Sequence, residues 1–267
     1  MSNRSSFRKS KLADWGFRLS VVSAHIVVFT VIFHRFAGQS TAVALNLLQI
    51  GFVGAFVALI ISLIGAVQIW NRLLSGFGKA VFGVFLSLLV LAWPLSQLPR
   101  YLISPPIYDV STDLTSPPLF QDLVAKREFG SNSTDFVKQA TFAEDVRPLR
   151  IKKSGQDAFD LVRQLVLKRK WELVAIKPLD KNTNVGYIEA VDYSYILAVP
   201  DDIVLRIKAK GKETILDMRS ASRYGSFDLG RNQQRIQNFF NDLITQNTDI
   251  DLVGKPSSPL HVGKKEN

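Results

Sequence analysis

The chain of 267 residues contains no cysteine and only three histidines, His25, His34 and His261. The stretch from 105 to 250 therefore has neither residue type. This absence excludes Ser-His-Asp and Cys-His catalysis there, and a zinc site would lack its usual ligands. The sequence also has no Walker-type glycine loop and no dinucleotide fingerprint. We therefore expect no cofactor and no metal, and we assign no catalytic residue.

Acidic residues are almost missing from the first hundred positions, where Asp14 is the single acid beside nine Lys and Arg. Eight of the ten net positive charges therefore belong to this part of the chain. The basic residues flank apolar runs and do not form one patch. Nucleic acid is consequently not an expected partner.

Three long runs in the same region carry no formal charge: Leu19–Phe33, Ala42–Trp70 and Ala80–Leu98. A bilayer core about 30 Å thick requires roughly 20 apolar helical residues. A buried helix in a soluble protein would explain one such run, but not three in succession. We predict three transmembrane helices between residues 15 and 99, with the lipid bilayer as a partner.

Basic residues near the ends of these runs predict the orientation. The N-terminal arm, residues 1–14, and the second loop, with Arg72 and Lys79, are strongly basic. After the third run only Arg100 precedes the next acid, Asp109. We therefore expect a cytoplasmic N-terminal arm and place the rest of the chain, after the third helix, on the opposite side. In a bacterium this is the periplasmic side of the inner membrane.

The remainder of the chain predicts an α+β fold. Prolines and turn residues over 100–120 indicate an extended connector. Residues 121–247 form the expected soluble domain, in which two helices pack on an antiparallel sheet of about four to five strands. The polar tail from 248 to 267 is expected to be disordered.

Residue spacing places the elements of this domain. Apolar residues recur at helical spacing from Ser154 to Lys170, and again after Asp228, a good N-cap residue. The Lys210-Gly211-Lys212 segment predicts a hairpin turn. Four β-type segments lie between the helices: Trp171–Lys177, Val185–Asp192, Tyr195–Val199 running on to Asp202–Ala209, and Glu213–Ser220.

The run from Asp217 to Arg235, DMRSASRYGSFDLGRNQQR, concentrates charge at a strand-to-helix junction. One interpretation is an internal salt-bridge network. Another is a site for an anionic ligand, a lipid headgroup or an envelope protein, bound by guanidinium forks and exposed N–H groups. A third is an envelope hydrolase or transferase that uses the carboxylates of Asp202 and Asp217. The candidate ligand-binding residues are Asp217, Arg219, Arg223, Arg231 and Asn232.

Several segments resemble a family known as domain of unknown function 1499. The resemblance rests on Tyr187-Ile-Glu-Ala-Val191, Asp201-Asp202-Ile-Val-Leu-Arg206, Asp217-Met-Arg-Ser-Ala-Ser-Arg-Tyr-Gly225 and Asp228-Leu-Gly-Arg-Asn232. Asp109-Val-Ser-Thr-Asp113 and Pro117-Pro118-Leu-Phe120 are similar to the opening segment of the same family. The resemblance spans roughly 105–245 and implies an extracytoplasmic domain that is often membrane-linked. It brings no established activity.

Overall fold

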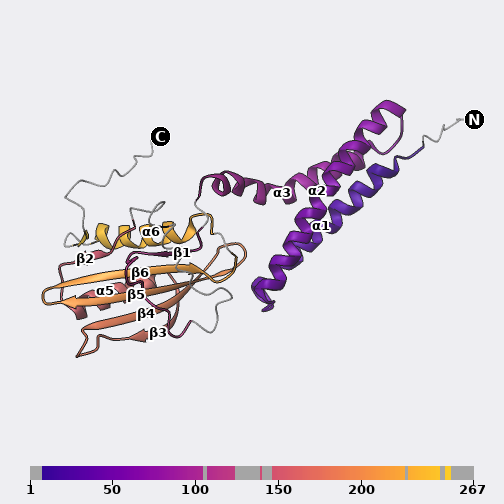
Figure 1. Ribbon diagram of the computed structural model, residues 1–267. Helices are drawn as coiled ribbons and strands as arrows, with labels where there is room; N and C mark the ends of the chain where they lie inside the picture. Colours follow the sequence, from indigo (N-terminus) through magenta and orange to yellow (C-terminus); the bar gives the residue numbers. More distant parts are fainter. Residues whose placement is uncertain are drawn as a thin grey trace, which may run out of the picture. The chain divides into compact units, whose positions relative to one another are not determined.

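The computed structural model describes residues 8–104, 107–123, 139, 146–225, 228–246 and 250–253. The chain divides into two compact units (Figure 1). The first comprises Met1–Ile103 together with Tyr195–Val199. The second comprises Ser104–Ser194 and Pro200–Asn267.

The first unit contains three long helices, α1 (Lys11–Phe36), α2 (Thr41–Arg72) and α3 (Phe77–Ile103). All three have the length and apolar composition needed to cross a membrane, as the sequence predicted. Ser10 caps α1, because its hydroxyl accepts a hydrogen bond from the N–H of Ala13 at 3.3 Å. Leu73 ends α2 in the left-handed conformation, with φ at 53°.

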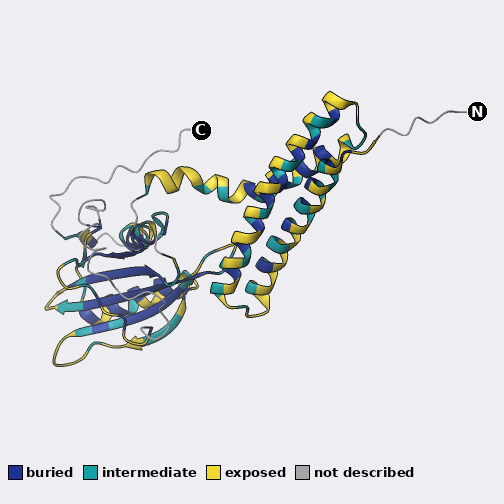
Figure 2. Ribbon diagram, turned by 45° about the vertical axis from the view of Figure 1, so that its right-hand side comes forward, coloured by how far each residue is buried: buried dark blue, intermediate teal, exposed yellow. Residues whose placement is uncertain are grey.

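Small residues form the contacts among these helices. The buried positions of α1, α2 and α3 are mostly Gly, Ala and Ser, whereas many large apolar residues of these helices are exposed. Figure 2 shows buried and exposed positions interspersed along the helices. A Cβ atom added at Gly16 or at Gly83 would collide with the side chain of Ser62. The helices therefore approach closely through small-residue packing, which is the usual arrangement inside a membrane.

The second unit is built on a seven-stranded antiparallel sheet. Its order along the main path is β3-β4-β5-β6-β2-β7, and β1 pairs separately with β6. Both β1 and β2 pair with β6, but along different parts of it. The strands are β1 (Asp109–Ser111), β2 (Leu149–Ile151), β3 (Glu172–Lys177), β4 (Val185–Tyr193), β5 (Pro200–Lys210), β6 (Glu213–Ser222) and β7 (Ile250–Leu252).

The predicted α+β class is confirmed, but the sheet has more strands than the four to five expected. The additional strands β1, β2 and β7 are three residues long, which is too short for alternation to reveal them. Strand β7 lies inside the tail that was predicted to be disordered from 248, so that prediction was wrong for Ile250–Leu252. The tail beyond 253 lies outside the described residues.

The prediction of β-structure at Tyr195–Val199 was also wrong. The apolar residues of this segment form a turn after β4, and β5 begins only at Pro200. The side chains of Tyr195 and Ile196 are exposed rather than packed in the sheet. Ala198 has a φ of 52°, a left-handed conformation that interrupts an extended strand.

Helices α5 (Gly155–Lys168) and α6 (Arg231–Gln246) pack on one face of the sheet, as predicted. Strand β5 presents Ile203, Leu205 and Ile207 to this face, where they join the main hydrophobic core. The intervening Val204 belongs to a second apolar cluster on the opposite face. Residues 107–123, here called the strap, contribute Phe120 and Leu123 to this second cluster.

Helix α6 begins at Arg231, slightly later than the predicted start near Asp228. Leu229 and Gly230 both adopt positive φ angles, of 58° and 76°, so the helix starts at Arg231. Asp228 still serves the helix start, because its carboxylate accepts hydrogen bonds from the N–H groups of Gly230 and Asn232, each at 2.8 Å. Burial raises the pKa of Asp228 above its ordinary value, although these two hydrogen bonds and Arg231 oppose the shift.

Candidate functional site

Charged residues of the run from Asp217 to Arg235 pair with residues of β4, of β5 and of the strap. Together they form two networks, one on each face of the sheet. The strap-face network lies between the sheet and the strap, and the helix-face network lies between the sheet and α6. The strap-face network comprises Asp109, Asp113, Arg206, Lys208, Asp217 and Arg219. The helix-face network comprises Asp192, Asp201, Ser220, Arg231, Asn232 and Arg235.

Arg219 is a deeply buried candidate, with only 2% of its side chain exposed. Its Nε and Nη2 donate to the two carboxylate oxygens of Asp109 at 2.9 and 2.7 Å, a bidentate pair. Its Nη1 donates to the carbonyl of Pro118 at 3.0 Å, and the guanidinium carbon lies 5.0 Å from the ring centre of Phe120. Arg219 thus joins β6 to both β1 and the middle of the strap.

Asp217 anchors the other end of the strap-face network. Its Oδ2 accepts from Nε of Arg206 and lies 2.9 Å from Nζ of Lys208. Arg206 also donates to Asp113 at 2.9 Å and to the carbonyl of Ser116 at 2.8 Å, both in the strap. Oδ1 of Asp217 is buried and has no hydrogen-bond partner among the residues that the structure describes.

The surrounding charges and hydrogen bonds shift the pKa of Asp113, a carboxylate of the strap. Burial raises its pKa, but the N–H of Ser116 and the positive charges of Lys208 and Arg206 outweigh that effect. The pKa of Asp113 consequently lies below its ordinary value of 3.8, which favours the ionised form that pairs with Arg206.

Glu189 is a buried residue that was not among the candidate site residues, although it lies in one of the segments that resemble the family. Its two carboxylate oxygens accept from the backbone N–H groups of Gln121, Asp122 and Leu123, at distances of 2.7, 3.1 and 3.0 Å. These three donors would otherwise be left without partners where the strap turns across β4. A contact over 66 residues of chain leaves no local signature, so no spacing pattern could have revealed it.

Arg235 is the centre of the helix-face network. It donates to Asp192 at 2.8 Å and to Asp201 at 2.6 Å, and further to Ser220 and Asn232. Burial lowers its pKa, but the charges of Asp201 and Asp192 outweigh this and raise the pKa above its ordinary value. Arg235 therefore joins α6 to β4, β5 and β6 as a permanent cation.

All hydrogen-bonding groups of the Asn232 side chain, another candidate, are engaged within the same network. Its amide nitrogen donates to the carbonyl of Tyr108 at 2.9 Å and to the hydroxyl of Ser222 at 3.1 Å. Its Oδ1 accepts from Ser220 and Arg235. These four contacts occupy the two donors and both lone pairs of the amide.

Arg223 and Arg231 are the candidates nearest to the surface. Arg223 pairs with the buried Asp202, donating from Nε to Oδ1 at 3.2 Å. Arg231 reaches Asp201 at 3.4 Å, a long contact, and 34% of its side chain is exposed. Because Arg235 already neutralises Asp201 at 2.6 Å, Arg231 can leave that carboxylate without uncovering a buried charge.

The carboxylates proposed for catalysis do not meet. In the β5–β6 register Asp202 faces Ala221 and Asp217 faces Arg206, so the two acids are four residues apart along the pair. That spacing corresponds to about 13 Å. Each is also paired with its own arginine. Among the described residues there is likewise no group of three His, Cys, Asp or Glu that could hold a metal ion.

Fold and charged networks together define a class: an antiparallel α+β domain, clasped by an N-terminal strap, that follows three helices with the properties of membrane spans. The family profile described as protein of unknown function (DUF1499) matches residues 109–243. The match covers just over half of the chain, and the chain belongs to this family. A comparison with curated proteins finds no match.

Proposed function

We propose that the chain is an integral protein of the bacterial inner membrane, with its N-terminus in the cytoplasm and its DUF1499 domain in the periplasm. The N-terminal arm and the α2–α3 loop share one end of the helical unit, because Ser75 donates to Arg8 at 3.1 Å and accepts from Ser10 at 3.0 Å. That end gathers most of the basic residues of the unit, which supports a cytoplasmic position under the positive-inside rule. They are Arg8, Lys9, Lys11, Arg18, Arg72 and Lys79, against Arg35 and Arg100 toward the other ends of α1 and α3.

The orientation predicts the behaviour of reporter fusions. An alkaline phosphatase fused after Asn267 should be active, because this enzyme requires the periplasm, while the same fusion after Ser75 should be inactive. A reporter that works only in the cytoplasm, fused at the same two positions, should give the opposite pattern. Cytoplasmic activity after Asn267 would overturn the proposed topology.

The domain itself acts, in this proposal, by binding a lipid headgroup, another anion or an envelope partner, and not by catalysis. The observation that carries it is the spare capacity of Arg231, whose guanidinium is partly exposed while its carboxylate partner is satisfied by Arg235. Arg219 and Asn232 have no such capacity, because each is buried with its hydrogen-bonding groups engaged. Arg231 would therefore make the ligand contact, while the other four candidates hold the surface that presents it.

A membrane ligand is within reach of the domain by chain length alone. Residues 104–108 are the whole connection between α3 and β1. Six Cα–Cα steps span roughly 20 Å at most. Anionic headgroups at a bilayer surface are therefore abundant near the domain, and a guanidinium fork matches a phosphate group.

Substituting Arg231 should weaken anion binding without disturbing the fold. We expect full-length Arg231→Ala to retain about tenfold less phosphatidylglycerol than wild type, because one charge-assisted contact is lost. Native mass spectrometry of protein released from nanodiscs with mixed phosphatidylglycerol and phosphatidylcholine measures the retention. Arg163→Ala is the matched control, since Arg163 is an exposed arginine on α5. Equal retention by Arg231→Ala, Arg163→Ala and wild type would reject Arg231 as the ligand contact.

A further inference from the structure

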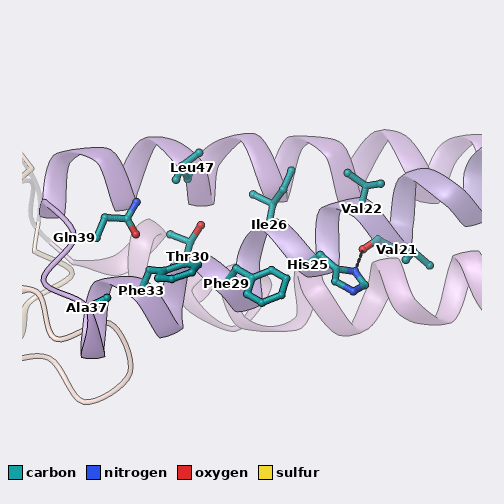
Figure 3. Close-up of a pocket in the computed structure, with 10 residues that line it drawn as sticks. All are labelled: Val21, Val22, His25, Ile26, Phe29, Thr30, Phe33, Ala37, Gln39 and Leu47. Atoms are coloured by element: carbon teal, nitrogen blue, oxygen red, sulfur yellow. Dashed lines mark hydrogen bonds between the residues drawn. The ribbon is translucent and has the colours of Figure 1, made fainter.

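A groove on the helical unit contains a polar group in an unexpected place. Residues of α1, of the α1–α2 connection and of α2 line an open groove of about 750 Å³ (Figure 3). Nearly all of the lining is apolar, and exposed aromatic rings form one side of it. His25 stands among them, near the middle of the 26 residues of α1. It would therefore lie near the centre of a bilayer, far from water.

One ring nitrogen of His25 is already hydrogen-bonded, which leaves the other nitrogen available to a ligand. Nδ1 lies 2.7 Å from the carbonyl oxygen of Val21, as the dashed line in Figure 3 shows. A carbonyl oxygen only accepts, so Nδ1 carries the proton of the neutral ring. Nε2 is then left with a lone pair and no proton; it belongs to an exposed side chain and has no hydrogen-bond partner among the described residues. An acceptor in hydrocarbon without a donor is energetically unfavourable.

This arrangement selects among possible occupants of the groove. A lipid tail fills apolar space but offers no donor to Nε2. A second copy that brought its own His25 to the same place would oppose one acceptor to another, which is repulsive. The occupant must therefore combine an apolar body with a hydroxyl or N–H donor.

The lining adds a preference for an aromatic body. The rings of His25 and Phe29 have centroids 5.9 Å apart, and those of Phe29 and Phe33 are 6.2 Å apart. Figure 3 shows the three side chains in a row along one side of the groove. A flat ring can pack against such a row in offset or edge-to-face geometry. Phe29 and Phe33 are each about half exposed, so their surfaces are available for this contact.

We infer that the α1–α2 groove binds a membrane-dissolved aromatic alcohol of the quinol type, whose hydroxyl donates a hydrogen bond to Nε2 of His25 while its ring lies against Phe29 and Phe33. Binding requires only that α1 and α2 span the bilayer and is independent of the proposed contact at Arg231. The matching quinone has carbonyl oxygens in place of hydroxyls and cannot donate to Nε2. The site therefore distinguishes the reduced from the oxidised form.

The three histidines of the chain make the inference directly testable. Full-length protein labelled with ¹⁵N-histidine is placed in nanodiscs and titrated with a decyl-substituted benzoquinol, and separately with its quinone and its dimethyl ether. We expect the Nε2 resonance of His25 to shift with the quinol at about three- to tenfold lower ligand concentration than with the quinone or the dimethyl ether. His34 should not respond, since its Nε2 is already paired with Thr41 and it does not line the groove.

Variants separate a loss of binding from a loss of structure. His25→Phe preserves an aromatic ring but removes the acceptor and with it the His25 resonance, so ligand retention in native mass spectrometry is compared instead. This variant should retain quinol and dimethyl ether equally. His34→Phe should keep the preference for quinol over dimethyl ether. Equal responses to quinol and ether in wild type would overturn the inference. So would a His25 resonance that is insensitive to quinol but changes with the ratio of protein to lipid, which would identify a second copy as the occupant.

Discussion

Replacing Arg219 with Met is expected to destabilise the domain by about 3–5 kcal/mol, the usual cost of leaving one partner of a buried ion pair without the other. The substitution removes both hydrogen bonds to Asp109 and the contact with the Pro118 carbonyl. Met has a similar volume, so the loss reflects charge and hydrogen bonding more than a cavity. Pulse proteolysis of the full-length protein in detergent, across a urea series, measures the free energy of unfolding.

The control for this experiment is Arg163→Met, which removes an exposed arginine from α5. We expect its effect to stay within about 0.5 kcal/mol of wild type. If Arg219→Met were as stable as the control, Arg219 would not be a structural cation.

Replacing Glu189 with Leu is the second large effect expected, about 2–4 kcal/mol. The change removes the acceptor of three backbone N–H groups, and each buried donor without a partner costs about 1–3 kcal/mol. The strap can recover part of this cost by separating from the sheet and exposing those groups to water. Hydrogen exchange of residues 119–123 should therefore accelerate along with the loss of stability measured by pulse proteolysis.

Glu172→Leu is the matched control for Glu189→Leu, because Glu172 is an exposed glutamate of the neighbouring strand β3. Its partner, the hydroxyl of Tyr193, is itself exposed and can bind water instead. We expect near-wild-type stability and unchanged exchange in the strap. Slow exchange of residues 119–123 in Glu189→Leu would show that the carboxylate does not hold the strap.

The elements that the sequence revealed are those with a long, repeated local pattern. Three uncharged apolar runs predicted α1, α2 and α3, because a membrane span needs about twenty consecutive residues and few other structures do. Alternation over eight to ten residues, as in Glu213–Ser220, likewise predicted the core of β6. The periodic apolar stripe of α6 was clear, whereas its start was displaced by Leu229 and Gly230, whose left-handed conformations have no apolar signature.

The elements that the sequence did not reveal depend on contacts far along the chain. Strand β1 is held by β6, about 110 residues away, and has only three residues of its own. Tyr195–Val199 shows the reverse error, since an apolar composition suitable for a strand occurs in a turn. Local composition indicates whether a segment is apolar enough to be buried. It does not indicate which distant segment packs against it.

In the charged run from Asp217 to Arg235, too, the local features were predictable and the distant contacts were not. Its position at a strand-to-helix junction was predictable, as was its ability to form an ion-pair network. Alternation along β6 assigns Asp217 and Arg219 to one face, but it does not reveal that the strap covers that face. The partner of Arg219 is Asp109, which the sequence placed in the connector and in the opening segment of the family resemblance but not at the site. Burial by a distant segment therefore distinguishes the buried Arg219 from the partly exposed Arg231.

The run from Asp217 to Arg235 holds the strap and α6 to the sheet, and we propose the partly exposed Arg231 as the ligand contact. The most direct test is a double-mutant cycle with Asp109→Leu, Arg219→Met and the double variant, each assayed for stability and for phosphatidylglycerol retention. We expect the double variant to be more stable than either single variant, which corresponds to a coupling larger than the loss of about 3–5 kcal/mol expected for Arg219→Met alone. Phosphatidylglycerol retention should return with the fold in the double variant. Negligible coupling, together with lost retention in a fully folded Arg219→Met protein, would contradict the account and identify Arg219 as a ligand contact.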